Sequence, residues 1–149
     1  MNDFRNYQGG YFKTVLSPEQ SGGEMAVLDL VLPKGAEPPP HLHEKEDESF
    51  YILEGIVDFY INGKLTRIAA GDFLFAPRNV PHYFKIISET ARILTIMTPG
   101  DLWNYFMEFS EPCKGDPITT PMQPRNQQEL EQMAKRISAR YAIRLLVPQ

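Results

Sequence analysis

The sequence predicts an all-β fold, an antiparallel sandwich or barrel, followed by two short helices. Short runs of alternating apolar residues follow one another at close spacing up to residue 99, and no helical pattern separates them. Thirteen prolines and ten glycines are spread along the 149 residues, which suits many short strands joined by turns. Beyond residue 99 the apolar residues recur at helical spacing instead.

The strand pattern is clearest around Asn62-Gly63. This dipeptide favours a type I′ hairpin turn, which needs two residues with positive φ, and it lies between two strand-like runs. Residues 24–32 and 48–53 are apolar on both faces, so we expect a second sheet or a partner chain to cover them. Residues 1–10 are expected to form a loose arm. The predicted strands comprise residues 11–16, 24–32, 48–53, 56–61, 64–69, 72–76, 82–87 and 91–98.

Two helices are predicted after the strands. Thr98-Pro99-Gly100-Asp101 has the features of a helix start, with Thr as the cap and Pro at the first helical position. This helix contains Trp103 and Tyr105, which belong either to its packing or to a pocket mouth. Asn126 followed by Glu129 resembles the capping box of a second helix. The apolar stripe of that helix is expected to pack against the barrel and comprises Leu130, Met133, Ala134, Ile137 and Tyr141.

Composition and charge exclude several classes of function. The net charge is −4 and the basic residues form no run, which argues against nucleic acid as a partner. Cys113 is the single cysteine, so no intramolecular disulfide can form. No apolar stretch is long enough to cross a membrane, so we expect a cytoplasmic protein. One domain is expected, divided into an arm with the first strand (1–23), a barrel core (24–99) and a helical extension (100–149).

Three histidines and one glutamate carry the strongest functional signal. His41 and His43 are two residues apart, so on one strand both rings point to the same face. Glu48 begins the next predicted strand, and His82 is the remaining histidine. Imidazole and carboxylate ligands suit a divalent transition metal ion that keeps positions open for water or substrate. The alternative is a partly exposed histidine pair beside a solvated acidic loop, residues 44–48.

Two spaced motifs contain these residues. Gly35-x5-His41-x-His43-x4-Glu48-x6-Gly55 resembles the first motif of the cupin superfamily at every fixed position. Gly71-x5-Pro77-x-Asn79-x2-His82-x3-Ile86 resembles the second motif, with Asn79 where the family has Gly and Ile86 where it has Asn. Asn tolerates the left-handed conformation that such a turn requires, and neither departure removes a ligand. The chain looks most like the small single-domain cupins that resemble quercetin dioxygenase.

The resemblance implies a jelly-roll barrel, or double-stranded β-helix, with one metal ion per chain. It assigns the ligands to His41, His43, Glu48 and His82, and it allows Fe, Mn, Ni, Co, Cu or Zn. Within this scheme Glu48 is also the catalytic base. Strand alternation predicts an apolar substrate pocket above the ion. Its lining comprises Phe50, Ile52, Phe84, Ile86 and either Leu74 or the pair Phe73 and Phe75.

Three functions fit this prediction. The first is a metal-dependent dioxygenase that acts on a flavonol-like, enol-like or catechol-like small molecule, with Glu48 accepting the substrate proton. The second is a non-oxidative isomerase, decarboxylase or lyase in which the metal acts as a Lewis acid. The third is a non-catalytic barrel that binds a small molecule. A homodimer is expected, because the strands that are apolar on both faces leave surface to cover and related cupins usually pair through them.

Overall fold

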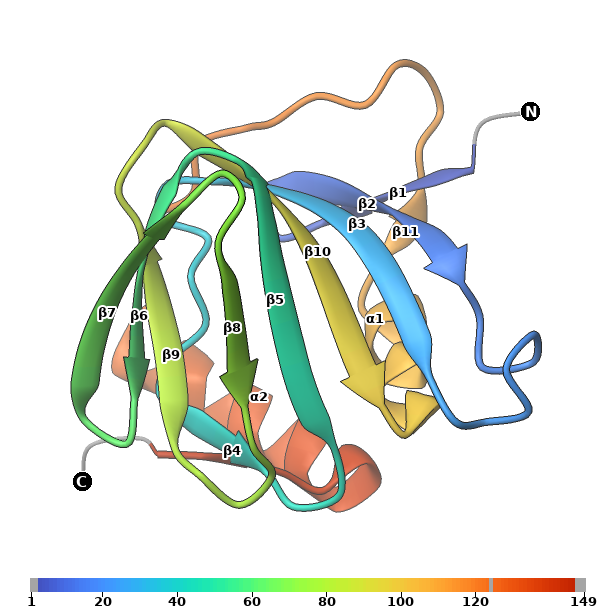
Figure 1. The fold of residues 1–149 in the computed structure, drawn as a ribbon, viewed down its shortest axis with the longest axis vertical. Helices are drawn as coiled ribbons and strands as arrows, with labels where there is room; N and C mark the ends of the chain where they lie inside the picture. The colour runs from blue at the N-terminus through green and yellow to red at the C-terminus, as the bar shows by residue number, and fades with distance from the viewer. Residues whose placement is uncertain (1–2, 124, 147–149) are drawn as a thin grey trace.

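Two antiparallel sheets face each other and form the barrel in a computed structural model that describes residues 3–123 and 125–146. Figure 1 shows the sheets as opposite walls, with the two helices at one end and one side. The seven-stranded sheet has the order β11-β1-β2-β3-β10-β5-β8, and the five-stranded sheet has the order β12-β4-β9-β6-β7. The strands are β1 (Phe4–Tyr7), β2 (Gly10–Leu16), β3 (Ala26–Pro33), β4 (His41–His43), β5 (Asp47–Glu54), β6 (Ile56–Ile61), β7 (Lys64–Ala69), β8 (Phe73–Ala76), β9 (His82–Ile86), β10 (Thr90–Thr98), β11 (Glu111–Pro112) and β12 (Ile143–Leu145).

The predicted strands are confirmed, and their turns follow from local chemistry. Asn62 and Gly63 both have positive φ, 51° and 81°, as a type I′ turn between β6 and β7 requires. Asn79 has a φ of 65° in the turn that leads into β9. Its short polar side chain tolerates this left-handed conformation, so the replacement of the family's glycine leaves the turn intact.

The core lies between the two sheets and is filled by alternate residues of their strands. In β3, the side chains of Leu28, Leu30 and Leu32 are buried while those between them are only half-buried. In β5, the inward side chains are Glu48, Phe50 and Ile52. Side chains of successive strand residues point to opposite faces, so one face of each strand builds the barrel interior.

The N-terminal segment corrects the expectation of a loose arm. Residues Phe4–Tyr7 form β1, which pairs with β2 on one side and with β11 on the other. Arg5 holds this edge in place, because its guanidinium donates to the hydroxyl and the carbonyl of Ser110. The arm is therefore part of the seven-stranded sheet, and this places Tyr7 beside the barrel interior.

Two helices follow the barrel strands. The first prediction was wrong at its start, because Thr98 still belongs to β10 and Pro99 occupies the N-cap without a side-chain cap. A 3-10 turn (η1, Gly100–Leu102) then leads into α1 (Trp103–Glu108). The second prediction is confirmed: Asn126 and Glu129 form a capping box at the start of α2 (Gln127–Tyr141). Among the described residues, no helix is both long and apolar enough to cross a membrane.

Candidate metal centre

Two neighbouring strands of one sheet and one strand of the opposite sheet bring the predicted ligands together. His41 and His43 lie on the same face of β4, and the backbone register pairs His41 directly with His82 of β9. Glu48 lies at the start of β5 in the opposite sheet and points into the same space. One ligand atom from each of the four side chains lies within 4.8 Å of all the others. All four side chains are buried, so this is not an exposed pair beside a solvated loop.

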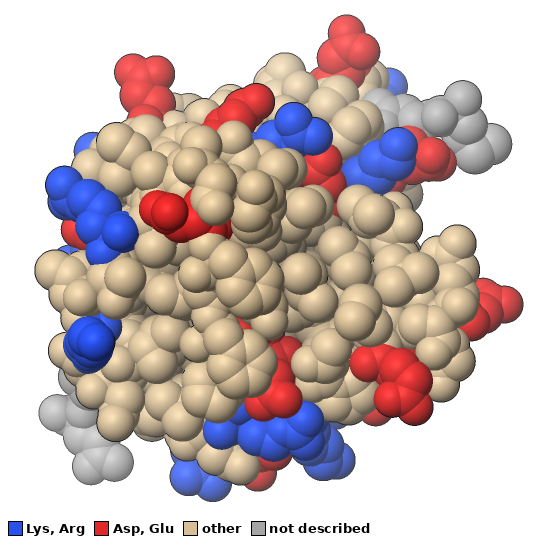
Figure 2. Space-filling model, viewed as in Figure 1, with Lys and Arg blue, Asp and Glu red and all other residues tan. Residues whose placement is uncertain are grey.

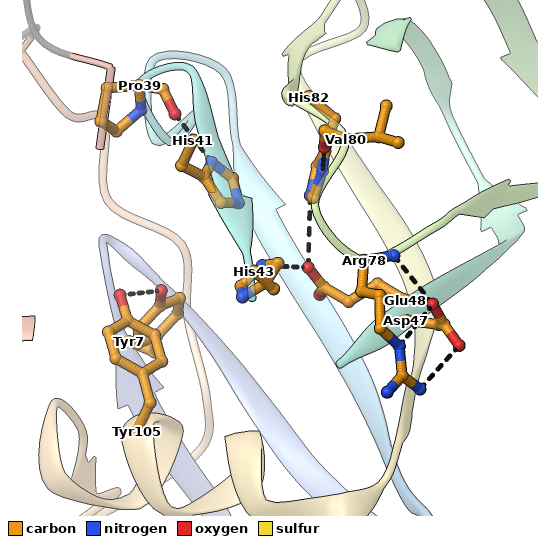
Figure 3. Close-up of polar contacts among 10 residues, drawn as sticks. All are labelled: Tyr7, Pro39, His41, His43, Asp47, Glu48, Arg78, Val80, His82 and Tyr105. Atoms are coloured by element: carbon orange, nitrogen blue, oxygen red, sulfur yellow. Dashed lines mark hydrogen bonds and ion pairs between the residues drawn. The ribbon is translucent and has the colours of Figure 1, made fainter. Parts of the chain in front are cut away.

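Backbone carbonyls orient two of the imidazole rings. Nδ1 of His41 lies 2.8 Å from the carbonyl oxygen of Pro39, and Nδ1 of His82 lies 3.2 Å from that of Val80. A carbonyl oxygen can only accept, so Nδ1 of each ring carries the proton. Nε2 is then the nitrogen that faces the cluster, which is the arrangement found in histidine ligands of metal sites. Figure 3 shows both rings held in this way.

The carboxylate of Glu48 is the electrostatic centre of the cluster. Its Oε1 lies 2.5 Å from Nε2 of His43 and 3.3 Å from Nε2 of His82. Burial alone would raise the pKa of Glu48, but the charge and contacts of His43 and His82 outweigh it and hold the pKa well below its usual range. Burial, together with the charges of His43 and His82, lowers the pKa of His41 to about 3. Glu48 is therefore ionised and His41 neutral near pH 7, as metal ligands must be.

Buried ring nitrogens without hydrogen-bond partners indicate whether the cluster can hold an ion. Neither ring nitrogen of His43 has a hydrogen-bond partner among the described residues, although Nε2 is only 2.5 Å from Oε1 of Glu48. The two atoms form a short ion-pair contact. Buried polar atoms without partners are costly, and an ion between Nε2 and the carboxylate would satisfy both. The cluster therefore fits a single divalent metal ion, with three nitrogen ligands and one oxygen.

A second buried carboxylate lies beside this cluster. Glu46 is 3% exposed, and its Oε1 has no hydrogen-bond partner among the described residues. Burial raises the pKa of Glu46, against the opposing charge of His43. The acidic run 44–48 therefore divides, with Glu44 outside in an ion pair with Arg144 and Glu46 and Glu48 inside. Glu46 is two residues before Glu48, so strand alternation could have predicted that its side chain also points into the barrel interior.

The cluster opens onto a cavity of about 90 Å³ inside the barrel. Phe50 and Phe84 line this cavity, as the alternation of their strands predicts. Ile52 and Ile86 are fully buried in the core but do not line it. Phe73 and Phe75 correct the prediction, because their side chains are 58% and 52% exposed on the outer face of β8. The two outward phenylalanines flank Leu74. Ala76, which follows Phe75, is buried and pairs with Glu48 of β5.

The far wall of the cavity comes from segments outside the two motifs. Tyr7 of β1 and Tyr105 of α1 line it, with their hydroxyl oxygens 2.9 Å apart. Figure 3 shows both rings with their hydroxyl ends toward the side where His41 and His43 lie. Ile137 of α2 and Arg125, which precedes α2, also line the cavity. Sequence reasoning raised Tyr105 only as a possible pocket residue and missed Tyr7 and Arg125.

Comparison with known proteins agrees with this architecture. Residues 28–97 match the family model described as the cupin domain. Quercetin 2,3-dioxygenase of Bacillus subtilis is 28% identical over 103 residues, which cover 69% of this chain and 31% of that protein. The chain spans 31% to 61% of the length of the curated relatives that it matches.

Solved structures show the same fold. KdgF from a Halomonas species superposes with a TM-score of 0.59 at 21% identity, covering 66% of this chain and 86% of that one. A predicted oxalate decarboxylase from Thermotoga maritima superposes with a TM-score of 0.56 at 29% identity, covering 64% of this chain and 90% of the other. These similarities support the barrel fold, and the chemistry depends on the site itself.

Proposed function

The chain is a cupin, with its cupin domain at residues 28–97, and from that premise we propose that it is a metal-dependent dioxygenase of a small enolisable molecule. The observation that carries the proposal is the buried cluster of three imidazoles and one carboxylate at the end of a largely apolar cavity. Such a cavity suits a substrate that is mostly apolar and carries an oxygen directed at the ion. The similarity to quercetin 2,3-dioxygenase supports the same reaction class.

His41, His43, Glu48 and His82 would hold the ion. A bound divalent ion supplies Lewis-acid chemistry and, when redox-active, a position for dioxygen. We assign to Glu48 the role of accepting the substrate proton, because its carboxylate is ionised at neutral pH and faces the cavity. Phe50 and Phe84 exclude water from the reacting end of the substrate.

The size of the cavity narrows the substrate class. An engineered protein cavity of about 150 Å³ binds benzene, and this cavity is smaller, at about 90 Å³. A multi-ring flavonol would fit only if the far wall moved away. We therefore favour a compact enol-type substrate over the flavonol and catechol classes.

Oxygen uptake tests the proposal. The chain is loaded separately with Fe(II), Mn(II), Co(II), Ni(II), Cu(II) and Zn(II), and oxygen consumption is followed with malondialdehyde, an enolisable probe that is smaller than benzene. We expect uptake with at least one redox-active ion, no uptake with Zn(II), and its loss in Glu48→Gln. Glu54→Gln is the matched control, because Glu54 lies on the same strand with its side chain 72% exposed. No oxygen uptake with any ion would reject the oxygenase.

A second candidate is a non-oxidative decarboxylase or isomerase. Enzymes of this type use a charged group in the pocket, and Arg125 lines this cavity. The similarity to a predicted oxalate decarboxylase supports this candidate. Turnover of a small acid with Zn(II) under anaerobic conditions would favour it over the oxygenase.

We also propose that the chain forms a homodimer through the outer face of the seven-stranded sheet. The outward side chains of β3 and β5 are only half-buried, and Phe73 and Phe75 project from the neighbouring strand β8. Figure 2 shows this face, where charged side chains are sparse over the centre. Light scattering tests the proposal: we expect a dimer for the wild type and a monomer for the double variant Phe73→Ser, Phe75→Ser. A monomeric wild type would reject it.

A further inference from the structure

Several side chains with O–H or N–H donors line the cavity apart from the metal cluster. A hydroxyl group carries one proton and can also accept, whereas a guanidinium has five N–H donors and no acceptor. Tyr7, Tyr105, Thr95 and Arg125 all line the cavity. We refer to these four residues as the donor wall. Their protons are the starting point for identifying the ligand.

The tyrosine pair has one hydroxyl proton that is not used in the hydrogen bond between the two residues. The two hydroxyl oxygens lie 2.9 Å apart, so one hydroxyl donates to the other. The accepting tyrosine keeps its own proton, and the structure shows no acceptor for it among the described residues. Burial raises the pKa of Tyr7 and that of Tyr105, so both hydroxyls stay protonated near neutral pH. The pair can therefore donate one hydrogen bond into the cavity.

Thr95 and Arg125 add further donors. The hydroxyl of Thr95 is buried, with the residue 2% exposed, and has no hydrogen-bond partner among the described residues. Arg125 donates to the amide oxygen of Gln8, which uses one of its five N–H groups. The positive charge of Arg125 opposes part of the rise that burial causes in the pKa of both tyrosines, which places Arg125 within electrostatic reach of their hydroxyls. A buried donor without an acceptor destabilises the fold. A ligand whose oxygens accept these hydrogen bonds would remove that cost.

We propose that the donor wall binds the carboxylate of a small acid, so that the natural substrate is a compact carboxylate whose other oxygen faces the ion. This assignment rests on the proposed function for the role of the ion, but the carboxylate contact itself does not. A carboxylate offers about four acceptor positions and one negative charge, which match two or more hydroxyl or N–H donors and the charge of Arg125. The cavity of about 90 Å³ limits the acid to a few non-hydrogen atoms.

A matched pair of probes tests the charge preference. Propionate and propionamide have the same size and shape, but only propionate is charged. Each is titrated into the full-length metal-loaded chain while amide chemical shifts are followed by NMR. We expect propionate to bind the wild type about tenfold more tightly than propionamide, since one hydrogen bond to a charged group is worth about that factor.

Variants of the donor wall identify the residues responsible. Arg125→Gln should remove the preference for propionate, Arg125→Lys should keep part of it, and Tyr105→Phe should weaken propionate binding about threefold. Arg144→Gln is the control, because Arg144 pairs with Glu44 on the outside and should leave both affinities unchanged. Thermal unfolding confirms that each variant is folded.

Two outcomes would overturn the proposal. One is equal affinity of the wild type for the two probes, or no binding of either. The other is an unchanged preference in Arg125→Gln, which would place the propionate on the ion instead of on the donor wall. Since the titration measures binding and not turnover, it can succeed in a chain that consumes no oxygen, so this failure and that of the proposed oxygenase are distinguishable.

Discussion

The two walls of the cavity are built in different ways. The ligand wall comes from β4, β5 and β9, in which backbone hydrogen bonds fix the position of each side chain, as the pairing of His41 with His82 shows. The far wall comes from β1, α1, α2 and β12. The two strands are paired within the sheets, but the side chains that they share with the helices come from distant parts of the sequence. Its central contact joins Tyr7 and Tyr105, which are 98 residues apart. Sheet register alone sets the ligand wall, whereas the far wall also depends on how side chains of the helices pack against β1 and β12.

This difference implies that the two walls have different roles in binding. Sheet register holds the metal ligands within a few ångströms of each other, whereas α2 is largely exposed and buries only Ile137 fully. A segment with few buried contacts opens more easily than a strand within a sheet. The ligand wall should therefore determine which ion binds, and the far wall should determine which molecule reaches the ion. The predictions below test whether the two walls act independently.

Loss of a ligand should have the largest effect. In His82→Ala we expect affinity for Co(II) to fall more than about a hundredfold, because even the loss of a residue that supports a ligand costs ten- to a hundredfold. Competition with a coloured chelator measures the affinity. Tyr83→Phe is the control, because Tyr83 is the next residue of β9 and stacks on Tyr60 on the other face. Unchanged affinity in His82→Ala would show that the ion binds elsewhere.

Truncation on the far wall should affect stability and leave the ion site alone. Ile137 is 3% exposed, so Ile137→Ala should lower the free energy of unfolding by about 2–4 kcal/mol. If the two walls act independently, affinity for Co(II) should change less than twofold. Urea unfolding and the chelator competition measure the two quantities. Lys135→Ala, on the exposed face of α2, is the control. A parallel loss of Co(II) affinity in Ile137→Ala would mean that the walls are coupled.

Glu46 tests how far the ligand wall extends. Nδ1 of His43 and Oε1 of Glu46 are both buried and without partners among the described residues. A ligand histidine usually donates its second N–H to a carboxylate or carbonyl, and loss of that partner costs ten- to a hundredfold in metal affinity. We expect Glu46→Gln, which removes the charge but keeps the shape, to weaken Co(II) binding about tenfold. Glu44→Gln, in the exposed pair with Arg144, should not. Equal affinities would exclude Glu46 from the ion site.

The ligand wall could be predicted from the sequence because its information is local. The spacing of His41 and His43 fixes their shared face once they lie on a strand, and the Asn62-Gly63 turn fixes the neighbouring hairpin. The alternation rule has one ambiguity, which is the face that points inward. It left open whether Phe73 and Phe75 or Leu74 faces the interior. The register that places buried Ala76 opposite Glu48 turns both phenylalanines outward.

The far wall could not be predicted in the same way. Tyr7 lies in a segment without a clear pattern, and Arg125 lies in a proline-rich connection just before α2. Both reach the cavity only because β1 pairs with β11 and α2 packs over the end of the barrel. Contacts between residues about a hundred positions apart depend on the whole fold. No periodicity in a single stretch of sequence encodes them.

An ion pair remote from both walls should give the smallest effect and serves as the reference. Asp58 of β6 accepts two hydrogen bonds from Arg67 of β7, at 2.7 and 3.0 Å. These hydrogen bonds lower the pKa of Asp58 in the folded chain. The Arg67 side chain is 61% exposed, so solvent screens the pair and we expect Asp58→Asn to cost about 1 kcal/mol at pH 7.

The pH dependence of that cost follows from the direction of the shift. A carboxyl group whose folded pKa is depressed stabilises the fold above its unfolded pKa, and the stabilisation is lost as the pH falls through the folded pKa. The difference in unfolding free energy between the wild type and Asp58→Asn should therefore be constant from pH 5 to 7 and shrink below about pH 4. Urea unfolding across this range measures it, and Co(II) affinity at pH 7 should match the wild type. A difference that grows on acidification, or a change in Co(II) affinity, would show that the hairpin is coupled to the ligand wall.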